Sequence, residues 1–211
     1  MNDLLPSQFI PHTAADFIGD AGEYAGLIAK LVERSKRAGR PSLRFLFHGP
    51  AGTGKSALAR WLVYDLLQCD KFSINGGKGS ALNGTQINVE RVEEFAASII
   101  YRDMYSDYKV IWIDECDKMS NSAQVRMLSL LDDLNEIPGV VLVCTSNEKL
   151  SDFEPRFQSR FNALDFKLPQ PEQVAALLRR FIADEEAIKQ ISTFACGNVR
   201  QALKDADLAL N

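Results

Sequence analysis

A glycine-rich segment near residue 50 constrains this chain more than any other feature of its sequence. It matches the pattern G-x-x-x-x-G-K-[ST] at every fixed position, through Gly49, Pro50, Ala51, Gly52, Thr53, Gly54, Lys55 and Ser56. Glycines let successive backbone N–H groups turn inward around a phosphate, where a Cβ atom would clash. By average residue usage, a chance match in a chain of this length is on the order of one in a hundred. The segment therefore predicts a phosphate-binding loop.

The residues on either side of this loop predict a strand before it and a helix after it. Residues 43–47 are typical of a short buried strand, and residues 58–67 are apolar at helical spacing. A helix that starts at Lys55 would point the positive end of its dipole at the bound phosphates. We expect Lys55 to neutralise the β- and γ-phosphate oxygens and Ser56 to offer its hydroxyl to Mg²⁺. The expected ligands are therefore ATP and Mg²⁺.

Strands and helices alternate through most of the chain. Continuous apolar runs at residues 110–113 and 140–143 predict strands that are covered on both faces, as in a parallel sheet. Residues 72–75 and 164–168 are weaker strand candidates. Helices are expected over residues 22–38, 89–101 and 121–134, the last with Asn121 and Gln124 as a capping pair. This alternation predicts an α/β fold, a P-loop NTPase parallel sheet sandwiched by helices.

The pattern becomes purely helical after Pro169. Apolar residues recur at helical spacing at Val174, Leu177, Leu178, Phe181 and Ile182, and further helices are expected to start near Asp184 and Asn198. We therefore predict two domains, an α/β ATPase domain at residues 1–168 and a small C-terminal helical lid at residues 169–211.

Polar residues at the ends of two predicted strands supply the second half of the expected site. Asp114 and Glu115 directly follow the strand at residues 110–113, and Asn147 follows the strand at residues 140–143. Asp114 can hold Mg²⁺ through water, and Glu115 can polarise the attacking water as a general base. The ends of parallel strands meet at one edge of a sheet, so Asn147 is expected to reach the γ-phosphate or the water.

Composition excludes several other classes of protein. The net charge is −4, from 24 Lys and Arg against 28 Asp and Glu, so the chain has no global basic field for nucleic acid. No apolar run is long enough to span a membrane, and residues 1–9 lack a secretory pattern, which predicts a cytoplasmic protein without a membrane partner. The four cysteines show no CxxC spacing, which favours free thiols over a zinc site.

Taken together, these motifs resemble AAA+ ATPases, and within them the clamp-loader group typified by replication factor C small subunits. Residues 16–19, with Phe17 and Ile18, resemble the motif on the adenine side of the nucleotide. Asp114 and Glu115 resemble the Walker B acids, and Asn147 resembles the sensor 1 position. Residues 159–161 resemble the motif that carries an arginine finger, and residues 197–203 resemble the sensor 2 motif.

The resemblance implies roles for two arginines. Arg200 would be the sensor 2 contact to the phosphates, and Arg160 would complete the site of a neighbouring subunit in trans. Arg156, one helical turn earlier, is a rival for the role of finger. A homo- or hetero-oligomer of AAA+ subunits follows from a trans finger, and the clamp-loader group implies DNA and a sliding clamp as partners. The resemblance covers the ATPase core, without the collar domain of clamp loaders.

Two other functions are compatible with the same motifs. One is an AAA+ ATPase that remodels proteins, and the other is an ATP-dependent module that binds a partner with little turnover. A remodelling enzyme should expose an aromatic pore loop, and no such loop is recognisable between Gly76 and Gly84, which favours DNA. Candidates for DNA contacts are Arg91, Lys118 and Arg126, although residues of this kind are more often ordinary solvated charges. The expected function is thus an ATP-hydrolysing motor or switch in DNA replication or repair.

Overall fold

The centre of the molecule is a parallel five-stranded sheet. The computed structural model describes residues 9–101 and 103–210, so the segment at residues 1–8 lies outside the described part. The strand order is β2-β3-β4-β1-β5, and every pair is parallel. The strands are β1 (Leu43–His48), β2 (Leu82–Asn83), β3 (Lys109–Asp114), β4 (Val140–Thr145) and β5 (Asn162–Asp165).

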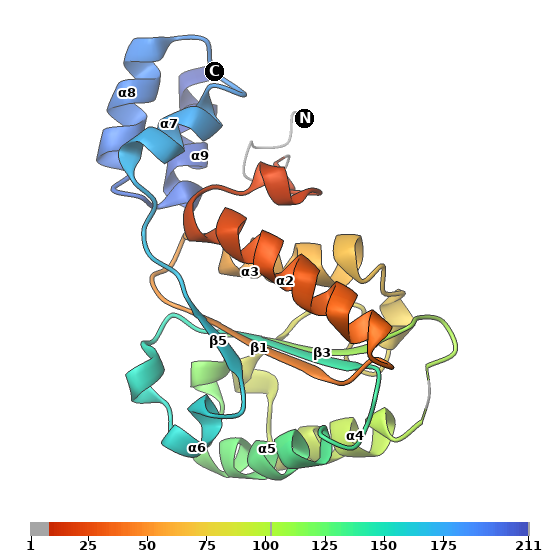
Figure 1. Ribbon diagram of the computed structural model, residues 1–211. Coiled ribbons are helices and arrows are strands. Elements are labelled where there is room, and N and C mark those ends of the chain that lie inside the picture. Colours follow the sequence, from red (N-terminus) through yellow and green to blue (C-terminus); the bar gives the residue numbers. More distant parts are fainter. Residues whose placement is uncertain (1–8, 102, 211) are drawn as a thin grey trace.

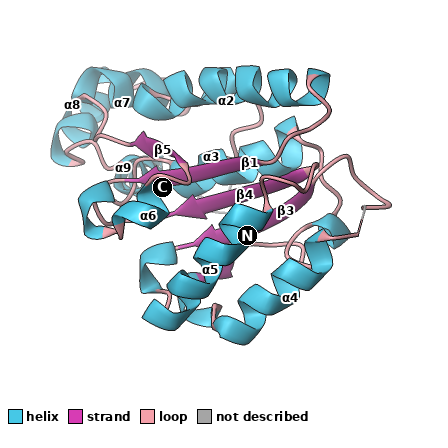
Figure 2. Cartoon of the chain, turned by 60° about the horizontal axis from the view of Figure 1, so that its bottom comes forward, coloured by secondary structure: helices cyan, strands magenta, loops and turns pink. Residues whose placement is uncertain are grey.

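Helices cover both faces of this sheet (Figures 1 and 2). One face carries α2 (Gly19–Arg37) and α3 (Lys55–Trp61), which continues as the π-helical η2 (Leu62–Leu66). The other face carries α4 (Val89–Ile99), α5 (Asn121–Asp133) and the short α6 (Pro155–Gln158). Single 3-10 turns lie at η1 (Ala14–Asp16), η3 (Lys71–Ser73), η4 (Gly84–Gln86), η5 (Cys116–Lys118) and η6 (Leu150–Asp152). The predicted α/β fold class is confirmed.

The three central strands are apolar along their length because both of their faces are buried. In β1, Phe45 and Phe47 pack into the apolar cluster under α2 and α3, whereas Leu46 packs into the cluster over α4 and α5. Alternation of this kind is expected, since successive side chains of a strand point to opposite faces. The continuous apolar runs that predicted these strands therefore reflect a sheet with no solvent-facing side.

The predicted strand at residues 72–75 is wrong. The Asp70 side chain accepts a hydrogen bond from the backbone N–H of Phe72 (2.8 Å) and starts the turn η3 there. Phe72 is 54% exposed, and only Ile74 makes a single parallel bridge, to Val110. The second strand is instead the two-residue β2, which pairs with the end of β3.

The predicted cap of the helix at residues 121–134 is also wrong. Ser120 is the N-cap of α5, and its Oγ accepts from the backbone N–H of Ala123 at 3.3 Å. Gln124 instead donates from Nε2 to the carbonyl of Met119 (3.1 Å). Ser120 takes the cap because its backbone is extended, which is the conformation an N-cap needs.

Three helices after Pro169 form a bundle beside the sheet, in blue at the upper left of Figure 1. They are α7 (Pro171–Leu178), α8 (Glu185–Phe194) and α9 (Val199–Leu210). They bury an apolar cluster of their own, with Val174, Leu178, Ile188, Ala202 and Ala206. We call this bundle the lid; the domain boundary at residue 168 stays a prediction.

The described residues also limit other chemistry. Cys69, Cys116 and Cys144 are buried and Cys196 is exposed, and all four are free thiols. Within the described residues, no group of three or more His, Cys, Asp or Glu side chains could hold a metal ion, and no helix is long and apolar enough to cross a membrane.

Candidate nucleotide site

A cavity of about 550 Å³ lies between the glycine-rich loop, the carboxyl ends of β3 and β4, and the lid. Loop residues 51–57 form one wall, and Asp114, Glu115, Thr145 and Asn147 form a second. Arg200 and Lys204 reach the cavity from the lid helix α9. Ligands of open parallel sheets bind outside the carboxyl ends of the strands, and this cavity has that location.

Lys55 lies at the base of the loop with its ammonium group turned onto the loop's own backbone. The Nζ atom donates to the carbonyl oxygens of Gly49 (2.7 Å) and Pro50 (2.6 Å). The residue is only 5% exposed, and its pKa is lowered to about 8, mainly by burial, which Asp114 opposes and the nearby Arg200 reinforces. A phosphate group that reached the ammonium would replace two neutral acceptors with a charged one.

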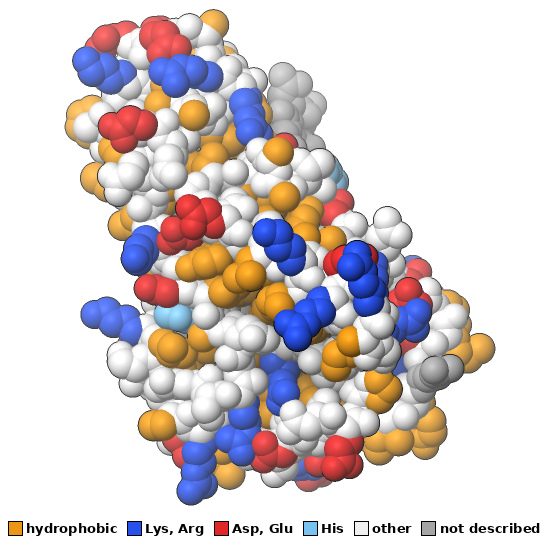
Figure 3. Space-filling view, in the orientation of Figure 1, with side chains coloured by type: hydrophobic (Ala, Val, Ile, Leu, Met, Phe, Trp, Pro, Cys, Tyr) orange, Lys and Arg blue, Asp and Glu red, His pale blue; other side chains and the backbone are white. Residues whose placement is uncertain are grey.

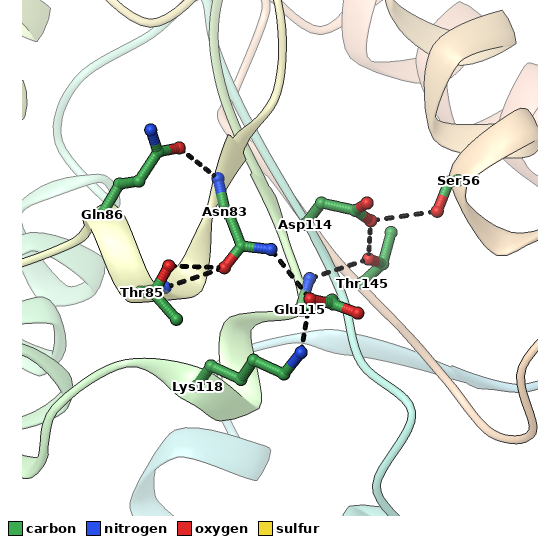
Figure 4. A network of polar contacts seen from close by, with 8 residues as sticks. All are labelled: Ser56, Asn83, Thr85, Gln86, Asp114, Glu115, Lys118 and Thr145. Atoms are coloured by element: carbon green, nitrogen blue, oxygen red, sulfur yellow. Dashed lines mark hydrogen bonds and ion pairs between the residues drawn. The ribbon is translucent and has the colours of Figure 1, made fainter.

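One carboxylate oxygen of Asp114 already accepts hydrogen bonds from two hydroxyl groups. Ser56 donates from Oγ to Oδ1 of Asp114 at 3.0 Å, and the Thr145 hydroxyl donates to the same oxygen (Figure 4). The Thr145 oxygen also accepts from the backbone N–H of Glu115 (3.2 Å). Mg²⁺ is held in proteins by one or two hard oxygen ligands together with substrate phosphates, and the Ser56 hydroxyl and Asp114 carboxylate fit that requirement.

The Glu115 carboxylate is held by two donors of its own chain (Figure 4). Its Oε2 atom accepts from Nδ2 of Asn83 (2.8 Å) and from Nζ of Lys118 (2.7 Å). Lys118 first, and then Asn83, hold the pKa of Glu115 below its usual value. Glu115 is therefore ionised near neutral pH, as a general base must be, and both of these hydrogen bonds are made to its Oε2 atom.

Backbone geometry fixes this pair of donors beside Glu115. Glu115 has a left-handed backbone (φ 53°), which turns the chain sharply into η5, where Lys118 lies. A Cβ atom at Gly84 would collide with the carbonyl oxygen of Glu115, so only glycine permits this close approach. Asn83, directly before it, is oriented by accepting from the backbone N–H (3.0 Å) and the hydroxyl (2.8 Å) of Thr85.

The lid contacts the glycine-rich loop directly. The backbone N–H of Val199 donates to the carbonyl of Gly52 at 2.9 Å. A Cβ atom at Gly52 would collide with the side-chain amide of Asn198, and the left-handed backbone there (φ 81°) also favours glycine. Arg200 follows in the first turn of α9. The lid and the loop therefore form one continuous surface around the cavity.

The end of the cavity away from the two acids is apolar. Phe17 and Ile18 line it together with Ala21, Leu177 and Leu203. The ring of Phe17 packs edge-on against Trp61, with centroids 5.9 Å apart. One end of the cavity is thus suited to a flat base and the other to a charged phosphate chain.

The predicted finger and DNA candidates do not line the cavity. Arg160 and Arg156 are absent from its lining. The three DNA candidates each pair with a carboxylate of the chain: Arg91 with Glu94, Lys118 with Glu115, and Arg126 with Glu93. Figure 3 shows positive and negative side chains interspersed over the face that α2 crosses, so that face carries no large field of one sign.

The sequence did not predict that Asn83 is part of the site, nor that Thr145 contacts Asp114 and Glu115. Asn83 precedes Gly84 at the end of a two-residue strand, which is too short to leave a period-2 pattern. Thr145 ends β4, where it is 2% exposed, while Asn147 is exposed on the cavity rim. Thr145 could have been found because it is a polar residue at the last position of a buried strand, and such a buried group needs a hydrogen-bond partner.

The fold and the cavity together define a P-loop ATPase with a helical lid. Residues 45–168 match the ATPase family associated with various cellular activities (AAA), and the chain belongs to that family.

Among curated proteins, the chain is similar to replication factor C subunits. It is 26% identical over 212 residues to the replication factor C small subunit of Aeropyrum pernix, covering 96% of this chain and 62% of that protein. It is 30% identical over 190 residues to small subunit 2 of Pyrobaculum arsenaticum, covering 86% and 56%. A probable subunit 5 of Dictyostelium discoideum is 28% identical over 169 residues, covering 75% and 47%. The chain therefore spans about half to three fifths of the length of these relatives.

A solved structure of Thermotoga maritima RuvB, described as a Holliday junction branch migration motor, superposes with a TM-score of 0.73. It covers 92% of this chain and 63% of the RuvB chain at 19% identity. This likeness supports the fold of the sheet and the lid.

Proposed function

We propose that this chain hydrolyses ATP in the presence of Mg²⁺ and acts as a clamp-loader-type motor or switch in DNA replication or repair. The observation that carries the proposal is the convergence of Lys55, Asp114, Glu115 and Arg200 on one cavity. These four charged groups, from the start of α3, the end of β3 and the lid helix α9, face the same 550 Å³ space, as phosphoryl transfer requires. The similarity to replication factor C subunits supports the place in replication. A cytoplasmic location is part of the same proposal.

In this mechanism, each residue has a distinct task at the triphosphate. Lys55 and Arg200 neutralise phosphate oxygens from the loop and the lid, and Ser56 and Asp114 are the ligands for Mg²⁺. Bound Mg²⁺ would neutralise the charge that develops on the phosphates. Asn147, on the cavity rim, is in reach of the γ-phosphate side, and Phe17 and Ile18 receive the adenine.

Glu115 would accept the proton of the attacking water. Its Oε2 atom is held by Asn83 and Lys118, which fix the orientation of the carboxylate, so we propose that these two residues restrain hydrolysis. The low pKa of Glu115 keeps the base ionised while it is restrained.

We further propose that residues 1–168 and 169–211 behave as two domains. The lid has its own apolar cluster and touches the loop through the Val199–Gly52 hydrogen bond. Nucleotide held between Lys55 and Arg200 would couple the two parts, in the manner of a closing lid.

The proposed partners are further AAA+ subunits, either copies of this chain or related chains, with Arg160 as the finger and Arg156 as the alternative. DNA and a sliding clamp are the proposed clients. An exposed apolar surface at Phe72, Ile100, Tyr101, Met104 and Tyr105, each 54–90% exposed, supports a protein partner. It lies near the start of β3, whereas the cavity is at the carboxyl ends of the strands. Tyr101→Ser with Met104→Ser should abolish retention of the chain on an immobilised clamp and leave ATP binding intact.

Two variants test the ATPase. Lys55→Ala should abolish detectable ATP binding, because the phosphates lose the only ammonium of the loop. Glu115→Gln should keep binding and lose hydrolysis, since an amide cannot accept the proton of water. Binding is measured by calorimetry and hydrolysis by phosphate release. Normal hydrolysis by Glu115→Gln would contradict the assignment of the base.

A further inference from the structure

Each nitrogen of the Arg160 guanidinium donates one hydrogen bond within its own chain. Nε donates to Oδ1 of Asp132 (2.7 Å) and Nη2 donates to Oδ2 (2.8 Å), which is the two-pronged geometry of strong arginine–carboxylate pairs. Nη1 donates to the backbone carbonyl of Arg156 at 2.7 Å. All three nitrogens of the guanidinium therefore have an acceptor, and the Arg160 side chain is only 26% exposed.

Asp132 is fixed in place by the last turn of α5. The carbonyl of the preceding Leu131 accepts from Nη1 of Arg44 (2.7 Å), and Nη2 of the same guanidinium donates to Oδ1 of Asn135 (2.7 Å). Arg44 comes from β1 and is partly buried, so it ties the end of α5 to the sheet. The carboxylate of Asp132 is thus presented to Arg160 from the end of α5, 28 residues away in the chain.

A finger that acts in trans has to offer its N–H groups to the phosphates of another subunit. In the observed arrangement, Asp132 occupies the Nε–Nη2 edge of the guanidinium, which can bind two oxygens at once. A phosphate chain presents the same pair of oxygens and competes for the same donors.

We propose that Asp132 is a positioning residue that holds Arg160 in a stored conformation until the nucleotide of a neighbouring subunit displaces it. This inference rests on the proposed function of Arg160 in trans. A subunit binds its neighbour productively only when Arg160 is released from Asp132. The apparent affinity of assembly is therefore the intrinsic affinity multiplied by the fraction of subunits in which Arg160 is released. Once assembly is complete the finger is in place, and the maximal rate is that of the unrestrained chain.

The test compares Asp132→Asn with Asp133→Asn, an adjacent exposed residue that loses the same charge with no side-chain contact to Arg160 recorded in the structure. The ATPase rate of the full chain is measured over a range of protein concentrations. Asp132→Asn should lower the concentration for half-maximal rate by about two- to fivefold, the range for an exposed ion pair, and leave the maximal rate unchanged. Asp133→Asn should match the wild type, and Asp132→Glu should restore much of the wild-type value. Thermal melting of all three variants checks that they are folded.

A second measurement does not depend on assembly. Phenylglyoxal modifies accessible guanidinium groups, and mass spectrometry of peptides locates the modified arginine. Arg160 should be modified about two- to fivefold faster in Asp132→Asn than in Asp133→Asn, because its stored position is lost. Equal modification of Arg160 in the two variants would overturn the proposal.

Failure of this inference can be told apart from failure of the proposed function. If Arg160→Ala hydrolyses ATP like the wild type at every concentration, the trans finger is wrong. If Arg160→Ala is inactive but Asp132→Asn and Asp133→Asn behave alike in both measurements, only the role of Asp132 is wrong.

Discussion

Glu115 and Arg160 are held in similar ways in two different parts of the molecule. Glu115 pairs with Lys118 and Asn83 on the wall of the nucleotide cavity, whereas Arg160 pairs with Asp132 outside the lining of that cavity. Each is a charged group that is hydrogen-bonded to partners from its own chain. The difference is their location, because Glu115 lines the cavity and Arg160 does not.

This comparison separates two kinds of variant. Changes to the cavity groups should have the same effect at any protein concentration, because the chain supplies all of them itself. Changes at Arg160 should act only where chains meet.

The largest effect is expected from the loss of Arg160, and its absence would contradict the difference drawn between Arg160 and the cavity groups. Arg160→Ala should reduce the maximal ATPase rate on the order of a thousandfold, since a finger neutralises charge that develops in the transition state, and leave ATP affinity nearly unchanged. Mixing Arg160→Ala with Lys55→Ala should restore some activity, because one protein offers an intact cavity and the other an intact finger. Rates are measured by phosphate release, with a related AAA+ chain added if this one does not self-associate. Dilute monomer that hydrolyses ATP at full rate and ignores Arg160→Ala would rule the trans mechanism out.

ATP affinity should fall at high pH because of Lys55. Its pKa of about 8 means that the free protein loses the ammonium charge above that pH, while bound phosphates favour the charged form. Binding above pH 8 therefore takes up a proton, and the affinity should fall by up to about tenfold per pH unit. Calorimetry in buffers of different protonation enthalpy measures both quantities. An affinity that stays level from pH 7 to about 9.5 would contradict this assignment of the pKa.

The lid should respond to nucleotide through Arg200. Arg200→Ala should weaken ATP binding by about tenfold, the loss expected for a hydrogen bond to a charged group. In the wild type, ATP should slow amide hydrogen exchange over residues 197–203, and the variant should lose that protection. Lys189→Ala, which removes a positive charge from the outer lid helix α8, is the control. Unchanged exchange with ATP bound would exclude the sensor role.

The smallest expected effect concerns the restraint on Glu115. Because Lys118 is the main cause of the lowered pKa of Glu115, Lys118→Met should raise that pKa toward its ordinary value. The ionised base is then lost at a higher pH, so the acidic limb of the ATPase pH profile should move upward. The shift should be the same at every protein concentration, unlike the effects at Arg160. A profile identical to that of the wild type would mean that Lys118 does not act on the base.

The sheet was predictable where burial leaves a continuous pattern. β1, β3 and β4 are covered on both faces, and their apolar runs predicted them. β2 was missed because two residues give no periodicity, while the apolar Phe72 that suggested a strand lies in an exposed turn.

In the candidate site too, local sequence patterns were predictable and contacts made by the fold were not. The loop at residues 49–56 and the two acids are local patterns, so sequence alone proposed them. Two of the side chains that hold Glu115 and Arg160 come from distant parts of the chain: the donor Asn83 is 32 residues from Glu115, and the acceptor Asp132 is 28 residues from Arg160. Their roles depend on strand register and on where a helix ends, which no local pattern of residue types specifies.

The contact between Gly52 and the lid has a consequence for how such a protein can be tuned. The loop and the lid meet through main-chain atoms of Val199 and Gly52, and the side-chain amide of Asn198 fills the space where a Cβ atom of residue 52 would lie. A side chain at residue 52 would therefore have to displace Asn198, which directly precedes α9. The left-handed backbone at this position would also strain any residue other than glycine. Residue 52 is thus a position at which a single added methyl group would disturb the lid and the glycine-rich loop together.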